Sequence, residues 1–181
     1  MLTHNDTVSA GENAPEEINV IIEIPKGSSI KYELDTTNGL IFVDRILLGA
    51  MYYPCNYGSI PKTKEEDGDP VDVLVLGNDP IIPMAVIRAR PVGVLLTEDE
   101  KGHDSKIVAA PLNKIDPSFS AIKEVDDIPG YLRNQITHFF EHYKELEQGK
   151  YVKIIGWKGR EIAKKQISEA INKFKSPDLV V

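Results

Sequence analysis

The chain has 181 residues and a formal net charge of −7, from 28 acidic residues against 21 lysines and arginines. Its hydrophobic fraction of 41% and charged fraction of 27% are typical of one globular domain and exclude a disordered or fibrous chain. The acidic balance argues against a nucleic-acid-binding protein, because proteins that bind the phosphate backbone present a basic face.

The first 14 residues are polar and predict a loose N-terminal arm, followed by a single domain over residues 15–181. The arm lacks the basic and apolar regions of a signal peptide, and no apolar run in the chain reaches the roughly 18 residues that span a bilayer. The single cysteine, Cys55, cannot form an intramolecular disulfide, which fits a reducing compartment. We therefore expect a cytoplasmic protein that does not bind membranes.

Short β-strands are predicted through the first two thirds of the chain. Residues 18–24 form an apolar, β-branched run, and residues 30–34 alternate between apolar and charged side chains. Apolar stretches bounded by Gly, Pro and Asp turns predict further strands at 40–46, 71–76, 86–96 and 106–110. Many short strands at this spacing predict a barrel or a strongly bent sheet.

Two helices are predicted after these strands. Asp126 and Asp127 precede Pro129 at a helix start, and Gly149 is expected to end that helix. Its apolar side chains recur on one face: Leu132, Ile136, Phe139, Phe140, Tyr143 and Leu146. A strand at 151–157 and a last helix over 162–174 complete a β-rich domain with helices packed on it.

The most informative segment is the acidic turn at residues 65–72, Glu-Glu-Asp-Gly-Asp-Pro-Val-Asp. Gly68 permits a tight turn, and Pro70 pushes Asp69 towards an extended conformation. Carboxylates crowded in this way repel one another unless cations bind between them, and Asp72 lies in a strand whose other residues look buried, where a charge needs a partner. Oxygen ligands alone indicate Mg²⁺ or Mn²⁺ rather than zinc.

A second acidic turn follows, with Glu98, Asp99, Glu100 and Asp104. Side chains able to hold a phosphate-bearing substrate are present elsewhere in the chain: Lys31, Arg45, Lys106, Lys144, Tyr57 and Tyr143. Taken singly, each would be a surface charge or a core tyrosine in most proteins.

Two short motifs offer alternative functions. Residues 138–142 match the H-x-x-E-H motif of a class of zinc proteases, but no third ligand accompanies His138 and His142. Residues 156–159 match the GXXG loop of KH-type RNA-binding modules, but they fall in a predicted strand, and the acidic charge opposes RNA binding. A zinc hydrolase and an RNA-binding module are therefore the alternative interpretations.

The acidic turn and its surroundings resemble the soluble family I inorganic pyrophosphatases of the short, bacterial type. The signature is Asp-Gly-Asp-Pro-Val-Asp-Val at residues 67–73, and the similarity runs from about Pro15 to the last helix. Other matching segments follow in order: residues 23–25, 30–33, 42–45, 53–58, 90–93, 99–100, 104–106 and 138–144.

The resemblance implies a five-stranded barrel of the oligonucleotide-binding type, flanked by two helices. It implies hydrolysis of pyrophosphate to two phosphates with several Mg²⁺ ions per active site, Mn²⁺ or other divalent cations as substitutes, and inhibition by Ca²⁺. Short members of this family are typically homohexamers built as dimers of trimers, so the same assembly is expected here.

The resemblance also assigns roles to single residues. The positions that match metal ligands are Asp67, Asp72, Asp99 and Asp104, and Asp69 matches the proposed general base. The positions that match phosphate-binding residues are Lys31, Arg45, Tyr57, Tyr143 and Lys144, with Lys106 near them. Glu23, Glu33 and Glu100 match carboxylates that hold metal-bound waters or orient the cationic side chains. In the implied reaction, two ions sharing Asp72 activate a water, and Asp69 takes its proton.

Overall fold

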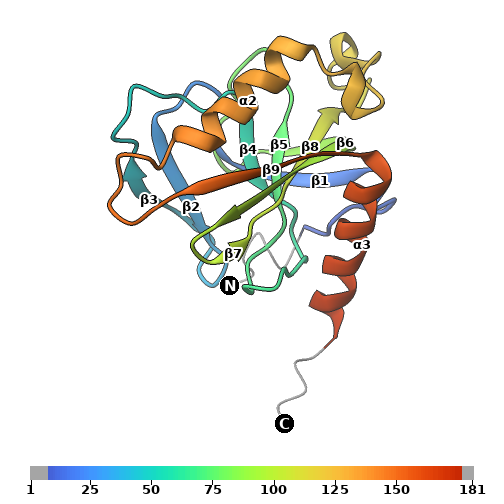
Figure 1. The fold of residues 1–181 in the computed structure, drawn as a ribbon. Helices are drawn as coiled ribbons and strands as arrows, with labels where there is room; N and C mark the ends of the chain where they lie inside the picture. Colours follow the sequence, from blue (N-terminus) through green and yellow to red (C-terminus); the bar gives the residue numbers. More distant parts are fainter. Residues whose placement is uncertain (1–7, 177–181) are drawn as a thin grey trace.

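The computed structural model describes residues 8–176, and nine β-strands and two long helices make up most of this range (Figure 1). The strands are β1 (Ile18–Ile24), β2 (Ile30–Asp35), β3 (Leu40–Ile46), β4 (Asn56–Ser59), β5 (Asp72–Val75), β6 (Val86–Asp99), β7 (Gly102–His103), β8 (Lys106–Pro111) and β9 (Val152–Gly159). The helices are α2 (Gly130–His142) and α3 (Arg160–Lys175), and two short 3₁₀ turns precede α2, Pro117–Phe119 and Val125–Asp127.

Five of the strands close into a ring. β1 pairs with β4 and β4 with β5, both antiparallel; β5 runs parallel to β8, and β8 pairs antiparallel with β6. The ring closes where the first residues of β6, from Val86 to Ala89, pair with β1. It is not a perfect barrel, since β6 has two register irregularities and continues past the ring to pair with β7 and β9. The predicted five-stranded barrel with two flanking helices is confirmed in this outline.

Apolar side chains pack on both sides of the ring. One buried cluster lies between the strands and α2, which contributes Ile136, Phe139 and Phe140. A second cluster includes Ala163 and Ile167 of α3 with apolar residues of several strands. Figure 1 shows α2 and α3 covering different parts of the strand ring. Because β1 lies between these packed layers, six of its seven residues are buried, which explains its continuous apolar run.

The predicted helix end at Gly149 is wrong. α2 ends at His142, and tighter turns follow, in which the Glu145 amide donates to the His142 carbonyl at 3.0 Å. Leu146, expected on the apolar face, is consequently 62% exposed. The apolar spacing is misleading here because the chain has already left the helix at His142, before Lys144, which contacts Asp99.

The strand predictions are otherwise close to the structure. β1 and β3 have the predicted bounds, whereas the strand expected at 86–96 continues to Asp99, and α3 begins two residues earlier than expected. β4 and β7 were not predicted, since they are short and lack alternating apolar residues. The GXXG stretch lies inside β9, paired with β6, rather than in a loop between helices.

The predicted loose arm is described only from residue 8, because residues 1–7 lie outside the described residues. Within the described part, Ala10 is buried and its carbonyl accepts a hydrogen bond from the Asn19 amide at 2.8 Å. Ala10 therefore packs against β1, whereas Ser9, Glu12 and Asn13 are exposed, and the loose arm stays a prediction. Neither of the helices in residues 8–176 has the length and apolar character needed to cross a bilayer.

Candidate active site

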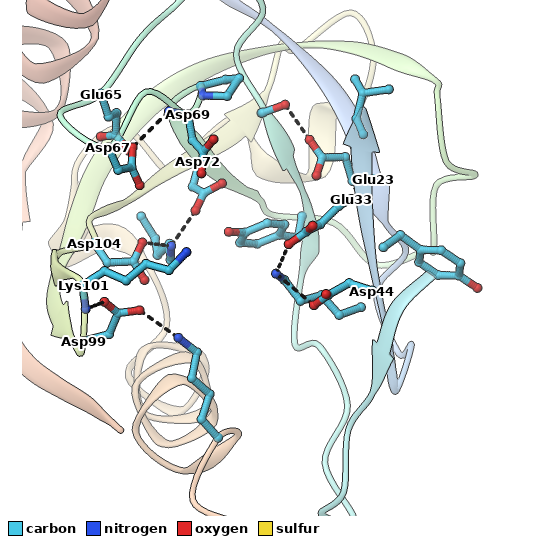
Figure 2. A pocket seen from close by; sticks show the side chains of 18 of the residues that line it. Glu23, Glu33, Asp44, Glu65, Asp67, Asp69, Asp72, Asp99, Lys101 and Asp104 are labelled. Atoms are coloured by element: carbon cyan, nitrogen blue, oxygen red, sulfur yellow. Dashed lines mark hydrogen bonds and ion pairs between the residues drawn. The ribbon is translucent and has the colours of Figure 1, made fainter. Parts of the chain in front are cut away.

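A cavity of about 770 Å³ lies between the β2–β3 hairpin, the acidic turn and the residues that follow α2 (Figure 2). Every residue predicted for the site lines it: Glu23, Lys31, Glu33, Arg45, Tyr57, Asp67, Asp69, Asp72, Asp99, Glu100, Asp104, Lys106, Tyr143 and Lys144. These residues belong to segments that are far apart in the sequence. The closure of the strand ring therefore brings the predicted site together.

The acidic turn forms one wall of the cavity. Gly68 has a φ of 97°, which permits the sharp reversal, and the Glu65 amide donates to the Asp69 carbonyl at 2.8 Å. The Asp69 amide donates to Oδ1 of Asp67 at 3.0 Å, so the Asp67 carboxylate is held against the backbone of Asp69. Figure 2 shows Asp67, Asp69 and Asp72 on the same side of the cavity, facing Asp104.

Lys106 connects the two acidic turns. It begins β8, the parallel neighbour of β5, and its ammonium group contacts Oδ2 of Asp72 at 2.5 Å and also Oδ1 of Asp104. The side chain is almost completely buried. Burial alone would lower the pKa of Lys106, but the two carboxylates raise it above its usual value. Lys106 is therefore a permanent positive charge in the acidic wall.

Asp99 is held by a second lysine. Lys144, just beyond α2, contacts Oδ2 of Asp99 at 2.8 Å, while the Lys101 amide donates to Oδ1 at 2.8 Å. Burial raises the pKa of Asp99, but these hydrogen bonds outweigh burial and hold the pKa below its usual value. Glu100 lies beside this pair and contacts Lys150 at 2.5 Å. Asp99 and Glu100 therefore face the cavity with pKa values held below their usual range by their lysine and backbone partners.

The β2–β3 hairpin supplies cations to the opposite side. Lys31 pairs with Arg45 across the hairpin, next to a register irregularity between Lys31 and Tyr32. The Lys31 ammonium lies 2.5 Å from Glu33 and 3.3 Å from Asp44. Arg45 lies 2.9 Å from Asp44 and 2.9 Å from Glu147. Carboxylates on both flanks thus orient the two cations towards the cavity.

The inner wall consists of buried polar groups. The Ser59 hydroxyl donates to Glu23 at 2.5 Å, and burial raises the pKa of Glu23 to about 8. Burial also raises the pKa values of the Tyr57 and Tyr143 hydroxyls. The ring of Tyr143 stacks on Phe139 with centroids 5.1 Å apart, and the residue also lines the cavity. Tyr143 therefore serves the core and the cavity at once.

The charge of the cavity suits divalent cations. Among the described residues, eleven carboxylates line it against six lysine and arginine side chains. Burial and the neighbouring carboxylates raise the pKa of Glu65 to about 8 and also raise the pKa of Asp69. Bound cations relieve such crowding, and oxygen donors of this kind fit Mg²⁺ or Mn²⁺.

The predicted ligands are not gathered around a single point. Within residues 8–176, no three acidic, histidine or cysteine side chains are arranged to hold a metal ion. Lys106 stands between Asp72 and Asp104, and Lys144 contacts Asp99. The donor types therefore fit a divalent metal, and lysine ammonium groups offset part of their charge.

Several residues in or beside the cavity were not assigned a role from the sequence. Asp44, Ser59, Glu65 and Lys101 line it, and Glu147, outside the lining, pairs with Arg45. Asp44 lies in the matching segment 42–45 and Glu65 in the acidic turn 65–72, so the sequence did indicate that both are near the site. It gave no such indication for Ser59 and Glu147, because the strand and the turn that place them were not predicted.

His138 and His142 lie on the flank of α2, away from these residues. Their ring centroids are 4.5 Å apart, and Nδ1 of His142 lies 3.0 Å from Glu145. Neither histidine lines the cavity. The H-x-x-E-H motif is thus separate from the site that the fold assembles.

Comparisons with known proteins agree with one another. The family model described as inorganic pyrophosphatase matches residues 20–175. The inorganic pyrophosphatase of Saccharolobus solfataricus is 58% identical over 91% of this chain and 96% of its own length, and that of Aquifex pyrophilus is 55% identical over 91% and 93%. The crystal structure of the Thermus thermophilus inorganic pyrophosphatase is similar with a TM-score of 0.90 at 43% identity, covering 93% of this chain and 97% of that one.

Proposed function

The chain belongs to the inorganic pyrophosphatase family, and we propose that it hydrolyses pyrophosphate to two phosphates in the cavity described above. One observation carries the assignment of this cavity. The carboxylates and cations that the resemblance predicts come from seven separate segments of the chain and all line the same space. A cavity with an acidic wall and a cationic wall suits an anionic substrate that binds together with divalent cations.

We further propose that Mg²⁺ is the cofactor of this divalent-metal-dependent hydrolase, with several ions held by Asp67, Asp72, Asp99 and Asp104. When bound, the ions lower the pKa of a water and offset the charge of the phosphates. Mn²⁺ is expected to substitute. Ca²⁺ is expected to inhibit, because its larger and more flexible coordination sphere misplaces the attacking water.

Asp69 is the proposed general base. Its amide hydrogen bond to Asp67 fixes the backbone, so the carboxylate keeps a defined position beside the proposed metal ligands. Burial, Asp67 and Asp72 raise its pKa from the ordinary value, in the direction that suits a proton acceptor working near neutral pH.

The cationic wall is proposed to hold the phosphates. Lys31 and Arg45 supply positive charge from the hairpin, Lys106 and Lys144 supply it from among the acidic turns, and Tyr57 and Tyr143 also line the cavity. As the bond to the bridging oxygen breaks, the departing phosphate gains negative charge, which these side chains stabilise. Glu33 and Glu100 orient the cations by direct ion pairs, and Glu23 holds Ser59.

We also propose that the chain assembles as a homohexamer. The support is the short length shared with its relatives and the pair of histidines on the flank of α2. Expectations that the protein is cytoplasmic and binds neither nucleic acid nor membranes remain predictions.

Release of phosphate from pyrophosphate tests the proposed function. We expect activity with Mg²⁺ and lower activity with Mn²⁺. Activity should vanish with excess EDTA or with Ca²⁺ as the sole cation. Asp72→Asn should nearly abolish turnover, whereas Asp126→Asn should not, because Asp126 is an exposed carboxylate that pairs with Arg133 outside the cavity. Turnover that survives EDTA would refute the metal-dependent mechanism.

A further inference from the structure

One cation of the cavity has no acidic partner. Five of the lysine and arginine side chains that line it form ion pairs: Lys31, Arg45, Lys106, Lys144 and Lys150. Lys101 also lines the cavity, yet in the described part of the chain no carboxylate lies within ion-pair distance of its ammonium group. Its positive charge is therefore available to a ligand.

The backbone of Lys101 is held in place. Asp99 pairs with Gly102 across the β6–β7 hairpin, so Glu100 and Lys101 form the two-residue loop that connects the strands. The Lys101 amide donates to Oδ1 of Asp99 at 2.8 Å, and Gly102 completes the turn with a φ of 122°. Only the four-carbon side chain is left free, and the residue is exposed. The turn therefore fixes where this side chain starts, while its ammonium group makes no ion pair within the described residues.

The side chain points into the cavity. Figure 2 shows it extending from the turn towards Asp104 and Asp72, opposite the cationic hairpin. Lys101 thus approaches the reaction centre from the acidic wall, on the side where the hairpin supplies no cation.

We propose that Lys101 binds a phosphate group of pyrophosphate, or of the product, from the acidic side of the cavity. This inference rests on the proposed function and adds a residue to the binding machinery of that site. A paired lysine must exchange its carboxylate for a phosphate oxygen, whereas Lys101 binds without losing an ion pair. Divalent cations on the neighbouring aspartates repel the ammonium group and leave the substrate anion as its partner.

Removing the charge of Lys101 should weaken the binding of phosphate but not the binding of Mg²⁺. Lys101→Gln keeps most of the side-chain length but removes the charge. Phosphate binding should therefore weaken by about 3–10-fold, the contribution of one charge-assisted contact in an exposed position. The affinity for Mg²⁺ alone should stay the same or increase. Lys101→Arg should retain most of the phosphate affinity, because it keeps the charge.

Calorimetric titration of inorganic phosphate into the Mg²⁺-loaded protein tests the proposal, together with KM and kcat for pyrophosphate. Lys101→Gln is compared with Lys101→Arg and with Lys114→Gln, which removes the same charge from an exposed site outside the cavity. We expect weaker phosphate binding and a larger change in KM than in kcat for Lys101→Gln alone. Equal unfolding temperatures verify that the variants are folded.

Three outcomes separate the possibilities. Phosphate affinity and KM within twofold of the unmutated protein would overturn the role of Lys101. Tighter Mg²⁺ binding without weaker phosphate binding would overturn it too, and would make Lys101 a competitor of the metal. If the unmutated protein fails to hydrolyse pyrophosphate, the proposed function fails instead, whatever the variants do.

Discussion

The carboxyl group of Glu23 illustrates how a single residue responds to its place in the fold. It is 8% exposed and accepts a hydrogen bond from Ser59, while Asp72, Lys31 and Glu33 act on it from neighbouring strands. Burial is the largest effect and raises its pKa to about 8. The folded chain therefore keeps this proton over a pH range in which the unfolded chain has lost it.

The stability of the metal-free protein should consequently depend on pH through Glu23. Because the folded pKa is raised, the contribution of the protonated group is complete below about pH 4.5 and is lost as pH rises towards 8. Glu23→Gln imitates the protonated form and should remove this dependence. Thermal unfolding in EDTA at pH 5, 6.5 and 8 should show the variant gaining on the unmutated protein by at least about 2–4 °C, the equivalent of 1 kcal/mol. Parallel curves at all three pH values would contradict the raised pKa.

Changing Asp67 or Asp69 to asparagine is expected to reduce activity for different reasons. Asp69→Asn keeps the shape but removes the proton acceptor, so kcat should fall by about 10²–10⁴ while Mg²⁺ affinity stays near that of the unmutated protein. Asp67→Asn retains an oxygen for the Asp69 amide but loses a ligand charge, and high Mg²⁺ should partly restore its activity. Metal titration beside kinetics at several Mg²⁺ concentrations distinguishes the two. Rescue of Asp69→Asn instead of Asp67→Asn would reverse the assignment.

At the scale of elements, the site depends on how closely β1 and β4 approach. Gly58 lies opposite Ile22 in this pairing, and a Cβ atom added there would stand 1.9 Å from the Ile21 carbonyl oxygen. The flanking residues of β4, Tyr57 and Ser59, both line the cavity. A small residue in the strand therefore allows the approach that positions two side chains of the site.

Gly58→Ala should separate the two strands. A contact of this length with a backbone oxygen cannot be relieved by a side-chain rotation. The free energy of unfolding should therefore fall by more than the 1–3 kcal/mol typical of overpacking, and activity should fall in parallel. Gly130→Ala, at the start of α2 with no atom within 4 Å of the added Cβ, should change stability by less than about 1 kcal/mol. Urea unfolding of both variants makes the comparison. A folded, fully active Gly58→Ala protein would show that β1 and β4 can shift without cost.

These elements also show why the sequence predicts some features and not others. β1 and β3 follow from hydrophobic periodicity, and the acidic turn follows from Gly68 and Pro70, because these are local signals. β4 has no such pattern, since Asn56 and Gly58 are dictated by contacts with distant segments. Just past the end of α2, Lys144 contacts Asp99, and no local pattern indicates a contact between residues 45 positions apart. Roles of Ser59 and Glu147 become visible only once those segments are placed.

At the scale of the whole molecule, the acidic residues are concentrated in one region. Many of the 28 acidic residues of the chain gather around the cavity, where lysines and the proposed divalent cations offset them. The remaining surface has its own features. The flank of α2 carries His138, which is exposed, and Tyr131, which is 74% exposed, on the side away from the buried Phe139 and Phe140. This flank is the candidate for a contact between subunits.

The proposed hexamer should therefore depend on the histidine pair. His138 and His142 stand one turn apart with ring centroids 4.5 Å apart, so a double change to alanine removes one continuous surface. Size-exclusion chromatography of His138→Ala/His142→Ala at neutral pH should show later elution and easier dissociation on dilution than the unmutated hexamer. Lys165→Ala/Glu169→Ala is the matched control, because it removes an equally spaced exposed pair from α3 and should leave the assembly intact. A hexamer unaffected by the histidine changes would place the contact on another surface, and an unmutated protein eluting as a monomer would refute the assembly itself.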